Sequence, residues 1–197
     1  MYPIIALDIE TTGLEFLKDE IIEIAAVRFL EGEPDKKLQF LLKPDQSIPY
    51  HISRLTGITS EMVATAPKLN DIIPQFLEFI GEDALIVHNA PFDIPFLEYH
   101  LNKNLQGKLN SLDDDKSLLL QNNQYDTLTL ARIFLPFQAG FSLLKLAEYF
   151  QIQITQHHRA LPDASAAGEI FLKLIEISLH TDLKDVRKIL DLCYHGA

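Results

Sequence analysis

The sequence predicts an α/β fold in which a mixed β-sheet is covered by helices. Short apolar runs at Ile4–Asp8 and Ala84–Val87 are typical of buried strands. The longer strand candidates Ile21–Leu30 and Leu38–Lys43 are separated by a turn-forming segment, Glu31–Asp35, which predicts that they pair as a hairpin. Because strands come first and then alternate with segments of helical periodicity, the order of elements predicts a mixed sheet.

Apolar residues at helical spacing predict the helices that follow the hairpin. Between Leu69 and Ile80 they form a single stripe. Asn70 would cap this helix, which places Pro74 in the first turn, and Gly81 would end it. Further helices are predicted over Phe92–Leu101, Thr127–Phe134, Ser142–Phe150, Pro162–Leu179 and Asp182–Leu192, and irregular segments over residues 46–68 and 102–124.

Length and composition bound the class of protein. A chain of 197 residues with 47% apolar and 23% charged residues is typical of one soluble globular domain, here residues 1–197. It contains no apolar run near the ~20 residues that span a membrane, and its N-terminus lacks the pattern of a secretion signal. The single cysteine, Cys193, cannot form an internal disulfide. We therefore expect a cytoplasmic protein with no membrane segment.

The net charge of −11 argues against one way of binding nucleic acid. Proteins that hold nucleic acid by neutralising its phosphates are usually basic. The sequence therefore does not predict a binding module that works by charge. An acidic enzyme can still act on nucleic acid where bound cations neutralise its site.

Four acidic residues lie where predicted elements begin or end. Asp8 and Glu10 are two residues apart at the end of the first strand, so an extended chain points both toward the same side. Asp93 follows the strand Ala84–Val87, and Asp163 begins the last long apolar helix. Taken singly, each has a simpler interpretation, as a solvated acidic turn or as a helix-entry acid favoured by the helix dipole. Together they indicate a cluster at strand ends, where ligands gather in α/β sheets.

Clustered carboxylates predict a bound cation. Two like charges held close together repel each other, and burial raises the pKa of both groups unless a cation lies between them. Hard oxygen ligands suit magnesium or manganese. We therefore expect Mg²⁺ or Mn²⁺ at this cluster.

Three segments resemble the motifs of a known family. Asp8–Leu14, of sequence DIETTGL, resembles the first motif of the DEDD 3′→5′ exonuclease superfamily, and His88–Asp93, of sequence HNAPFD, resembles the second. His158–Ala164, of sequence HRALPDA, resembles the third motif in its DEDDh form, with histidine five residues before aspartate. Weaker matches lie at Leu55–Thr59 and Tyr125–Arg132. The motifs occur in order over most of the chain and are most similar to those of the epsilon-like exonucleases, which proofread for bacterial DNA polymerase III.

The resemblance implies a fold and a mechanism. The fold is ribonuclease-H-like, a five-stranded mixed sheet with its first three strands antiparallel and with flanking helices. Two metal ions would serve phosphodiester hydrolysis. Their ligands would be Asp8, Glu10, Asp93 and Asp163. His158 would be the general base, because its ordinary pKa near 6.5 suits that role; a polar loop is the simpler interpretation of this histidine pair taken alone. His157 is assigned no role.

The resemblance also assigns residues to the bound 3′ end. Glu10 would accept a hydrogen bond from the terminal 3′-hydroxyl, and the turn after it would contact the terminal nucleotide, with Leu14 against a base. Several relatives carry histidine where Thr56 stands. Thr56 therefore has two alternative interpretations, a contact with the substrate or a structural role in the turn before Gly57. Phe92 can equally belong to the core. The predicted substrate-binding set is Glu10, Thr11, Thr12, Leu14, Leu55, Thr56, His88, Asn89 and Phe92.

These observations predict a 3′→5′ exonuclease that releases 5′-mononucleotides from single-stranded DNA ends. Thr11 favours DNA, because oligoribonuclease-like relatives tend to carry methionine there; an exoribonuclease that trims RNA ends is the alternative. A non-catalytic interaction module would be expected to lack a metal ligand or the histidine, and this sequence lacks neither. The resemblance leaves open whether the chain is a DNA polymerase subunit or a stand-alone enzyme. No residue pattern predicts its oligomeric state.

Overall fold

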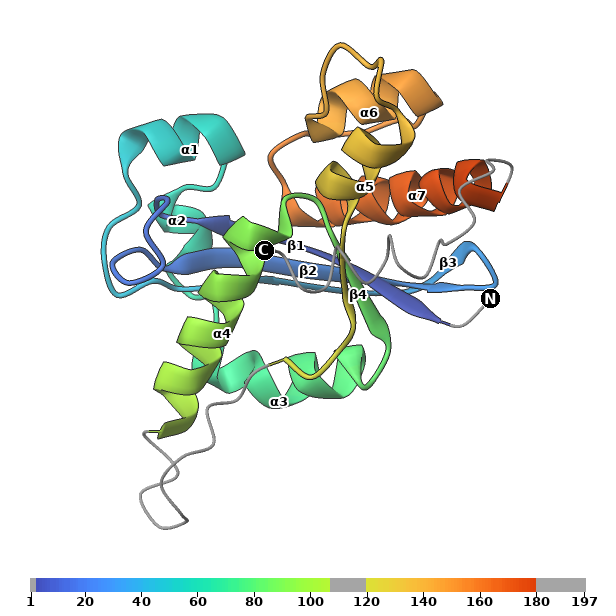
Figure 1. The fold of residues 1–197 in the computed structure, drawn as a ribbon. Helices are drawn as coiled ribbons and strands as arrows, with labels where there is room; N and C mark the ends of the chain where they lie inside the picture. Colours follow the sequence, from blue (N-terminus) through green and yellow to red (C-terminus); the bar gives the residue numbers. More distant parts are fainter. Residues whose placement is uncertain (1–2, 107–119, 180–197) are drawn as a thin grey trace.

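Short apolar strands and amphipathic helices combine in a five-stranded sheet with helices packed on it (Figure 1). The computed structural model describes residues 3–106 and 120–179. The strands are β1 (Ile4–Thr11), β2 (Ile21–Leu30), β3 (Glu33–Leu41), β4 (Ala84–Val87) and β5 (Gln124–Asp126). The helices are α1 (Tyr50–Thr56), α2 (Ser60–Val63), α3 (Leu69–Ile80), α4 (Ala90–Gln106), α5 (Thr127–Phe134), α6 (Leu143–Phe150) and α7 (Ala160–Leu179).

The strand order of the sheet is β3-β2-β1-β4-β5. β1 pairs with β2, and β2 with β3, in antiparallel orientation, whereas β1 with β4 and β4 with β5 are parallel. The prediction of a mixed sheet whose first three strands are antiparallel is therefore confirmed. β1 lies in the middle of the sheet, and its carboxyl end points in the same direction as that of β4, which is where ligands bind in such sheets.

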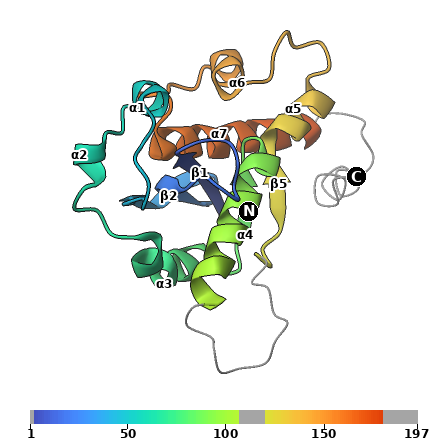
Figure 2. The ribbon, with the colours of Figure 1, turned by 90° about the vertical axis from the view of Figure 1, so that its left-hand side faces the viewer.

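Alternation along β1 divides the core between the two faces of the sheet. Ile5, Leu7 and Ile9 pack with residues of α3 and α4 on one face. Ile4 and Ala6 pack with residues of α5, α6 and α7 on the other face. Figure 2 shows these two layers, with α7 on one side of the sheet and α3 on the other. Because successive side chains of a strand alternate between faces, the even-numbered residues beyond Ala6 point toward α7.

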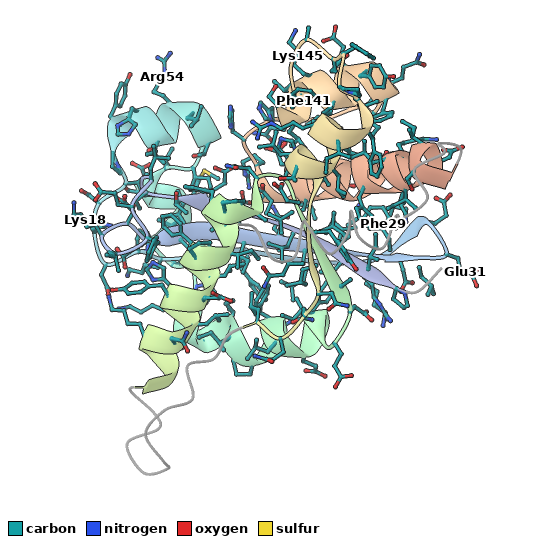
Figure 3. All side chains as sticks on the ribbon, viewed as in Figure 1. Lys18, Phe29, Glu31, Arg54, Phe141 and Lys145 are labelled. Carbon is teal, nitrogen blue, oxygen red and sulfur yellow. The ribbon has the colours of Figure 1, made fainter. Side chains whose placement is uncertain are left out.

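A glycine lets α7 lie close against the sheet. A Cβ atom at Gly168 would stand 2.2 Å from the ring of Phe29 and 3.0 Å from the Cβ of Ala6, so only glycine fits there without a shift of the helix. Phe29 is fully buried between β2 and α7 (Figure 3). This close packing holds the first turns of α7, which carry Asp163, over the carboxyl end of β1.

The structure confirms the hairpin but lengthens its second strand. β3 begins at Glu33, so residues 33–35 lie in the strand, and the predicted turn is wrong over these positions. The turn is made by Glu31 and Gly32, both of which have positive φ. Pro34 is tolerated in β3 because this strand lies at the edge of the sheet.

The start of α3 differs from the prediction. Its N-cap is Lys68 rather than Asn70, because the Asp71 carboxylate accepts a hydrogen bond from the Lys68 amide at 3.0 Å. Pro74 therefore lies in the second turn of the helix and not in the first. Gly81 ends the helix as predicted. The next helix, α4, begins two residues before its predicted start and continues to Gln106.

The two segments predicted to be irregular contain regular structure. Residues 46–68 include α1 and α2, and residues 102–124 include the end of α4 and the first residue of β5. β5 has only three residues, and its strand conformation depends on pairing with β4. The predicted helix Asp182–Leu192 lies outside the described residues. Within the ranges that the structure describes, no helix has the length and apolar character needed to cross a membrane.

Candidate active site

A cleft of about 480 Å³ lies at the carboxyl ends of β1 and β4. Five segments form its walls: the end of β1, the β4–α4 connection with the first turn of α4, the start of α5, the start of α6, and the loop leading into α7 with the first turn of that helix. Eight of the predicted site residues line it, namely Asp8, Glu10, His88, Asn89, Phe92, Asp93, His158 and Asp163. The structure thus brings together every predicted metal ligand and the predicted general base.

Three carboxylates form the centre of the cleft. Asp8 and Glu10 follow Ala6 on the face of β1 that points toward α7, where Asp163 lies in the first turn. One oxygen atom from each of the three groups lies within 4.8 Å of the others. Asp8 and Glu10 are partly accessible from the cleft, whereas Asp163 is buried. The side-chain alternation that predicted this convergence is confirmed.

The charge of this cluster is not balanced by the protein. Burial, followed by the charges of Asp93, Glu10 and Asp163, raises the pKa of Asp8 well above its ordinary value. Burial, followed by the charges of Asp163 and Glu23, raises the pKa of Glu10 to about 8. In the described part of the chain, no ion pair joins Asp8, Glu10 or Asp93 to a cationic side chain. Converging hard oxygen atoms without a counter-ion are a donor set that fits divalent cations such as magnesium or manganese.

Asp93 enters the cleft from the opposite face of the sheet. It lies in the first turn of α4 and is buried, and burial is the main cause that raises the pKa of its carboxyl group. β1 continues past its pairing with β4, which ends at Ala6, and the Ile9 amide donates a hydrogen bond to Asp93 Oδ1 at 3.3 Å. This bond holds Asp93 beside the strand that carries Asp8.

The loop before α7 places two histidines beside Asp163. The His158 amide donates to Asp163 Oδ2 at 3.0 Å, and His157 Nδ1 lies 3.1 Å from Asp163 Oδ1. His158 has a φ of 58°, a left-handed conformation that is uncommon for histidine and is held here by the contact with Asp163. Burial, followed by the charge of His157, lowers the pKa of the His158 imidazole. His158 is therefore neutral at pH 7 and able to accept a proton.

The β4–α4 connection is held by Asp126, at the end of β5. Asp126 Oδ1 accepts hydrogen bonds from the amides of Asn89 (2.8 Å) and Ala90 (3.4 Å), and Asn89 has a φ of 72°. His88 Nδ1 lies 2.8 Å from Thr127 Oγ1, and burial lowers the pKa of His88 to about 4. These contacts fix the turn that leads into Asp93.

A buried ion pair anchors the loop on its other side. Glu23 on β2 is fully buried and accepts hydrogen bonds from the guanidinium of Arg159, at 2.7 Å for Nη2 and 3.0 Å for Nε. The Ala160 amide and the Gln39 side chain also donate to Glu23, at 3.0 and 2.8 Å. Glu23 lies directly opposite Glu10 in the β1–β2 pairing. The residue after His158 is thus tied to the strand next to the acidic cluster.

Sequence reasoning assigned no role to four residues that shape this site, namely Glu23, Asp126, His157 and Arg159. Each had a signal. Glu23 is the only acid between Ile21 and Leu30, a strand that is apolar except for Glu23 and Arg28, and a buried acid requires a partner. Asp126 precedes an apolar helical segment, as an N-cap does, and it accepts hydrogen bonds from the Leu128 and Thr129 amides. No residue pattern identified the partner in either case.

Five predicted substrate residues lie outside this cleft. The hydroxyl of Thr12 accepts hydrogen bonds from the Glu20 amide and from Gln46, and that of Thr56 donates to the Ile52 carbonyl, so both hydroxyls hold the local backbone. The Thr11 hydroxyl donates to the Gly13 carbonyl at 2.5 Å. Thr11, Thr12 and Thr56 are buried, whereas Leu14 is 80% exposed and Leu55 is 51% exposed. Of these five side chains, only the two leucines are free to contact a ligand.

Phe92 lies between the cleft and the core. Its side chain lines the cleft and is only partly buried. It also packs against the α3–α4 side of the core, with its ring centroid 5.0 Å from that of Phe96.

A family model described as an exonuclease, RNase_T, matches residues 5–171. The chain belongs to this exonuclease family. The prediction of a DEDD-type exonuclease is therefore confirmed at the level of the family. The family uses divalent metals, and the carboxylates that converge in this cleft are a donor set that fits such ions.

Relatives and solved structures agree with the assignment. The chain is 36% identical over 172 residues to the DNA polymerase III subunit epsilon of Aquifex aeolicus, covering 87% of this chain and 80% of that protein. It is also 36% identical over 185 residues to the PolC-type DNA polymerase III of Caldanaerobacter subterraneus, covering 94% of this chain but 12% of that much longer protein.

Two solved exonucleases share the fold. Exonuclease X in complex with 5′ overhanging duplex DNA superposes with a TM-score of 0.69 at 24% identity, covering 96% of this chain and 99% of that one. E. coli exonuclease I in complex with a dA16 oligonucleotide gives a TM-score of 0.73 at 18% identity, covering 97% and 42%. The predicted ribonuclease-H-like fold is confirmed.

Proposed function

We propose that this exonuclease hydrolyses terminal phosphodiesters in the 3′→5′ direction, with single-stranded DNA ends as its substrate and magnesium or manganese as its metals. The observation that carries the proposal is the set of converging acids without a counter-ion, with a neutral histidine beside them. Such a set suits a reaction on an anionic phosphodiester only when cations enter with or before the substrate.

The acids divide into two groups of ligands. Asp8, Glu10 and Asp163 would hold one ion, because their oxygen atoms already converge. Asp93 would hold a second ion together with Asp8, since the hydrogen bond from the Ile9 amide holds Asp93 beside the strand that carries Asp8. When bound, such a pair of ions supplies an activated water and neutralises charge on the phosphate and on the leaving oxygen.

His158 would take the proton from the attacking water. Its imidazole lines the cleft and its pKa is below the ordinary value, so it is deprotonated at neutral pH. The hydrogen bond from the His158 amide to Asp163 keeps this residue next to the ligands. A general base placed in this way contributes about two to four decades of rate.

The turn after β1 would receive the terminal nucleotide. Glu10 faces the cleft and would accept a hydrogen bond from the 3′-hydroxyl. Leu14 and Leu55 expose apolar side chains on which a base can pack. Thr12 and Thr56 would act indirectly, by holding the backbone that carries these leucines.

DNA is favoured over RNA because the relatives named above are DNA polymerase III proteins and the two solved structures contain DNA. A role in proofreading or repair, with a polymerase subunit as partner, follows from the same relatives. The net charge of −11 adds a physical reason for a partner, because the chain offers little cationic surface to grip a strand. Such a role would place the protein in the cytoplasm.

A timed digestion of matched strands tests the proposal. Single strands of DNA and RNA, labelled at either end, are incubated with the protein and Mg²⁺. We expect immediate release of the 3′ label as a mononucleotide and stepwise shortening of the 5′-labelled DNA strand. Asp163→Asn should be inactive, whereas Asp35→Asn, an exposed acid on the edge strand β3, should be fully active. Release of the 5′ label first, internal cleavage, or activity in Asp163→Asn would contradict the proposal; faster digestion of RNA would change the substrate.

A further inference from the structure

His157 is a cleft residue that the proposed reaction does not use. Its side chain is 28% exposed, and its ring centroid lies 3.9 Å from that of His158. Its Nδ1 atom lies 3.1 Å from Asp163 Oδ1. One ring nitrogen from each histidine and one Asp163 oxygen all lie within 4.8 Å of one another.

The distances in this group suit a tetrahedral metal ion. Two ligand atoms that are each about 2.0–2.2 Å from a tetrahedral zinc ion lie about 3.3–3.6 Å from each other. The separation between His157 Nδ1 and Asp163 Oδ1 is already close to that value. The His158 ring nitrogen of this group lies within 4.8 Å of the other two ligand atoms, and the cleft that the three residues line leaves a fourth position open for water.

The ligand types separate this group from the all-carboxylate cluster. Imidazole nitrogen atoms suit zinc and its neighbours in the first transition series, whereas magnesium prefers oxygen ligands and octahedral geometry. Asp163 belongs to both groups, because its carboxylate also converges with those of Asp8 and Glu10. An ion held by the histidines would therefore compete for one ligand of the other cluster.

We propose that His157, His158 and Asp163 form a separate binding site for zinc-class ions, and that a zinc ion bound there stops hydrolysis. Binding follows from the geometry of the three side chains alone. The inhibitory effect rests on the proposed function, because zinc would draw Asp163 away from the acids of β1 and occupy the imidazole of His158. Zinc would thus act as a reversible inhibitor that magnesium does not displace from the histidines.

The competing interpretation is that His157 only orients Asp163 through its hydrogen bond. His157→Gln separates the two, because glutamine can still donate to the carboxylate but is a poor zinc ligand. His51→Gln is the matched control, since His51 is an exposed histidine on α1 that does not line the cleft. Both changes replace one solvent-accessible imidazole with the same amide.

Cobalt is the probe for binding, because Co²⁺ in a four-coordinate nitrogen site absorbs strongly in the visible range, whereas octahedral oxygen-ligated Co²⁺ absorbs weakly. The metal-free protein is titrated with Co²⁺ in excess Mg²⁺, and zinc is then added to displace the cobalt. We expect an intense band in the parent protein and in His51→Gln, and at least about a tenfold loss of affinity in His157→Gln. An unchanged band and affinity in His157→Gln, or no intense band in the parent protein, would overturn the site.

The inhibitory effect is measured as the half-inhibitory zinc concentration at fixed Mg²⁺ on a 3′-labelled strand. It should rise at least about tenfold in His157→Gln and stay constant in His51→Gln. Equal values in all three proteins would disprove inhibition through this site. A His157-dependent cobalt band in a protein that does not cut the strand would leave the metal site intact and refute the proposed function. Hydrolysis of the strand without such a band would support the proposed function and refute the metal site.

Discussion

Glu10 and Glu23 lie opposite each other on neighbouring strands, but their carboxylates differ in the partners that the protein provides. Glu23 is fully buried and accepts hydrogen bonds from the Arg159 guanidinium, the Ala160 amide and Gln39. Glu10 has no such partner, and its pKa is raised to about 8. Glu23 is therefore neutralised by a cationic side chain of the protein and has a structural role. Among the described residues, Glu10 has no such counter-ion, as expected for a residue that binds a cation from solution.

The same contrast separates two adjacent residues of one loop. Arg159 is committed to Glu23, and its side chain is only 18% exposed. His158, the residue before it, lines the cleft and contacts Asp163 through its backbone. Arg159 anchors the loop to the sheet, and the adjacent His158 faces the site. Substitutions of site residues should therefore lower activity, whereas substitutions in the Arg159–Glu23 pair should lower stability.

The largest expected effect is that of Asp8→Asn. Loss of this ligand should lower the rate of strand hydrolysis by at least about a thousandfold, since metal ions contribute several kcal/mol of charge stabilisation. In chelator, the same variant should melt at a higher temperature than the parent protein, because it removes one of the like charges that repel in the cluster. Hydrolysis rates and metal-free melting curves are the measurements. A lower melting temperature in chelator would show that Asp8, like Glu23, is stabilised by partners within the protein.

His158→Ala should lower kcat by about two to four decades and change KM little, because the imidazole acts on the attacking water rather than on the bound strand. Full kinetic curves at saturating Mg²⁺ measure the two constants separately. The thermal stability of the variant should stay close to that of the parent, since the loop is held by Arg159. A large loss of stability with unchanged kcat would assign His158 to the anchoring side of the loop.

Arg159→Met should destabilise the protein by about 3–5 kcal/mol, because it leaves the buried Glu23 carboxylate without its charged partner. Replacing both partners, in Arg159→Met with Glu23→Gln, should recover most of that loss, since no charge is then buried alone. Urea unfolding at pH 7 gives the three free energies. If the double variant is as unstable as the single one, the ion pair does not account for the anchoring.

Metal-free stability should fall as the pH rises. The folded-state pKa of Glu10, about 8, lies above its unfolded value of 4.5, so its contribution is fully present below pH 4.5 and is lost as the pH rises through 8. Allowing for the partial solvent exposure of Glu10, we expect a loss of about 2–4 kcal/mol over this window. Mg²⁺ should therefore stabilise the protein more at pH 8.5 than at pH 5.5.

The control for this pH dependence is Glu10→Gln, which cannot ionise. Urea unfolding in chelator and in Mg²⁺, at both pH values, should show a smaller slope for this variant than for the parent protein. Equal slopes would mean that other groups cause the dependence. Greater stabilisation by Mg²⁺ at pH 5.5 would contradict the idea that cations replace protons in this cluster.

The features predicted correctly from the sequence are those with local patterns. Apolar runs predicted β1, β2 and β4, because burial selects such residues within a few positions of one another. The spacing of Asp8 and Glu10 predicted their convergence, because two residues is the period of a strand. The positions of Asp93 and Asp163 at element boundaries added them to the acidic cluster, and the resemblance then implied their roles as ligands and the antiparallel pairing of the first three strands.

The features that were missed depend on contacts between distant segments. Glu23 and Arg159 are 136 residues apart, and their pairing follows from the packing of α7 against β2. β5 has three residues of mixed polarity, too few for a periodic pattern, and exists because β4 lies beside it. The contact of His157 with Asp163 occurs in a loop where His158 has a left-handed backbone, which no residue type predicts.

His88 differs from both glutamates, because it is an ionisable group that is buried in its neutral form. Its substitution has the smallest expected effect. Burial outweighs the charge of Asp126 and lowers the pKa of His88 to about 4, so the imidazole stays neutral beside Thr127. Its contribution to stability is present above pH 6.5 and is lost as the pH falls through 4. We expect a loss of about 1–3 kcal/mol between pH 7 and pH 4 that is absent in His88→Gln. Urea unfolding at the two pH values measures the difference. An equal loss in both proteins would show that the fold does not lower the pKa of His88, and would separate His88 from Glu10, whose pKa burial shifts.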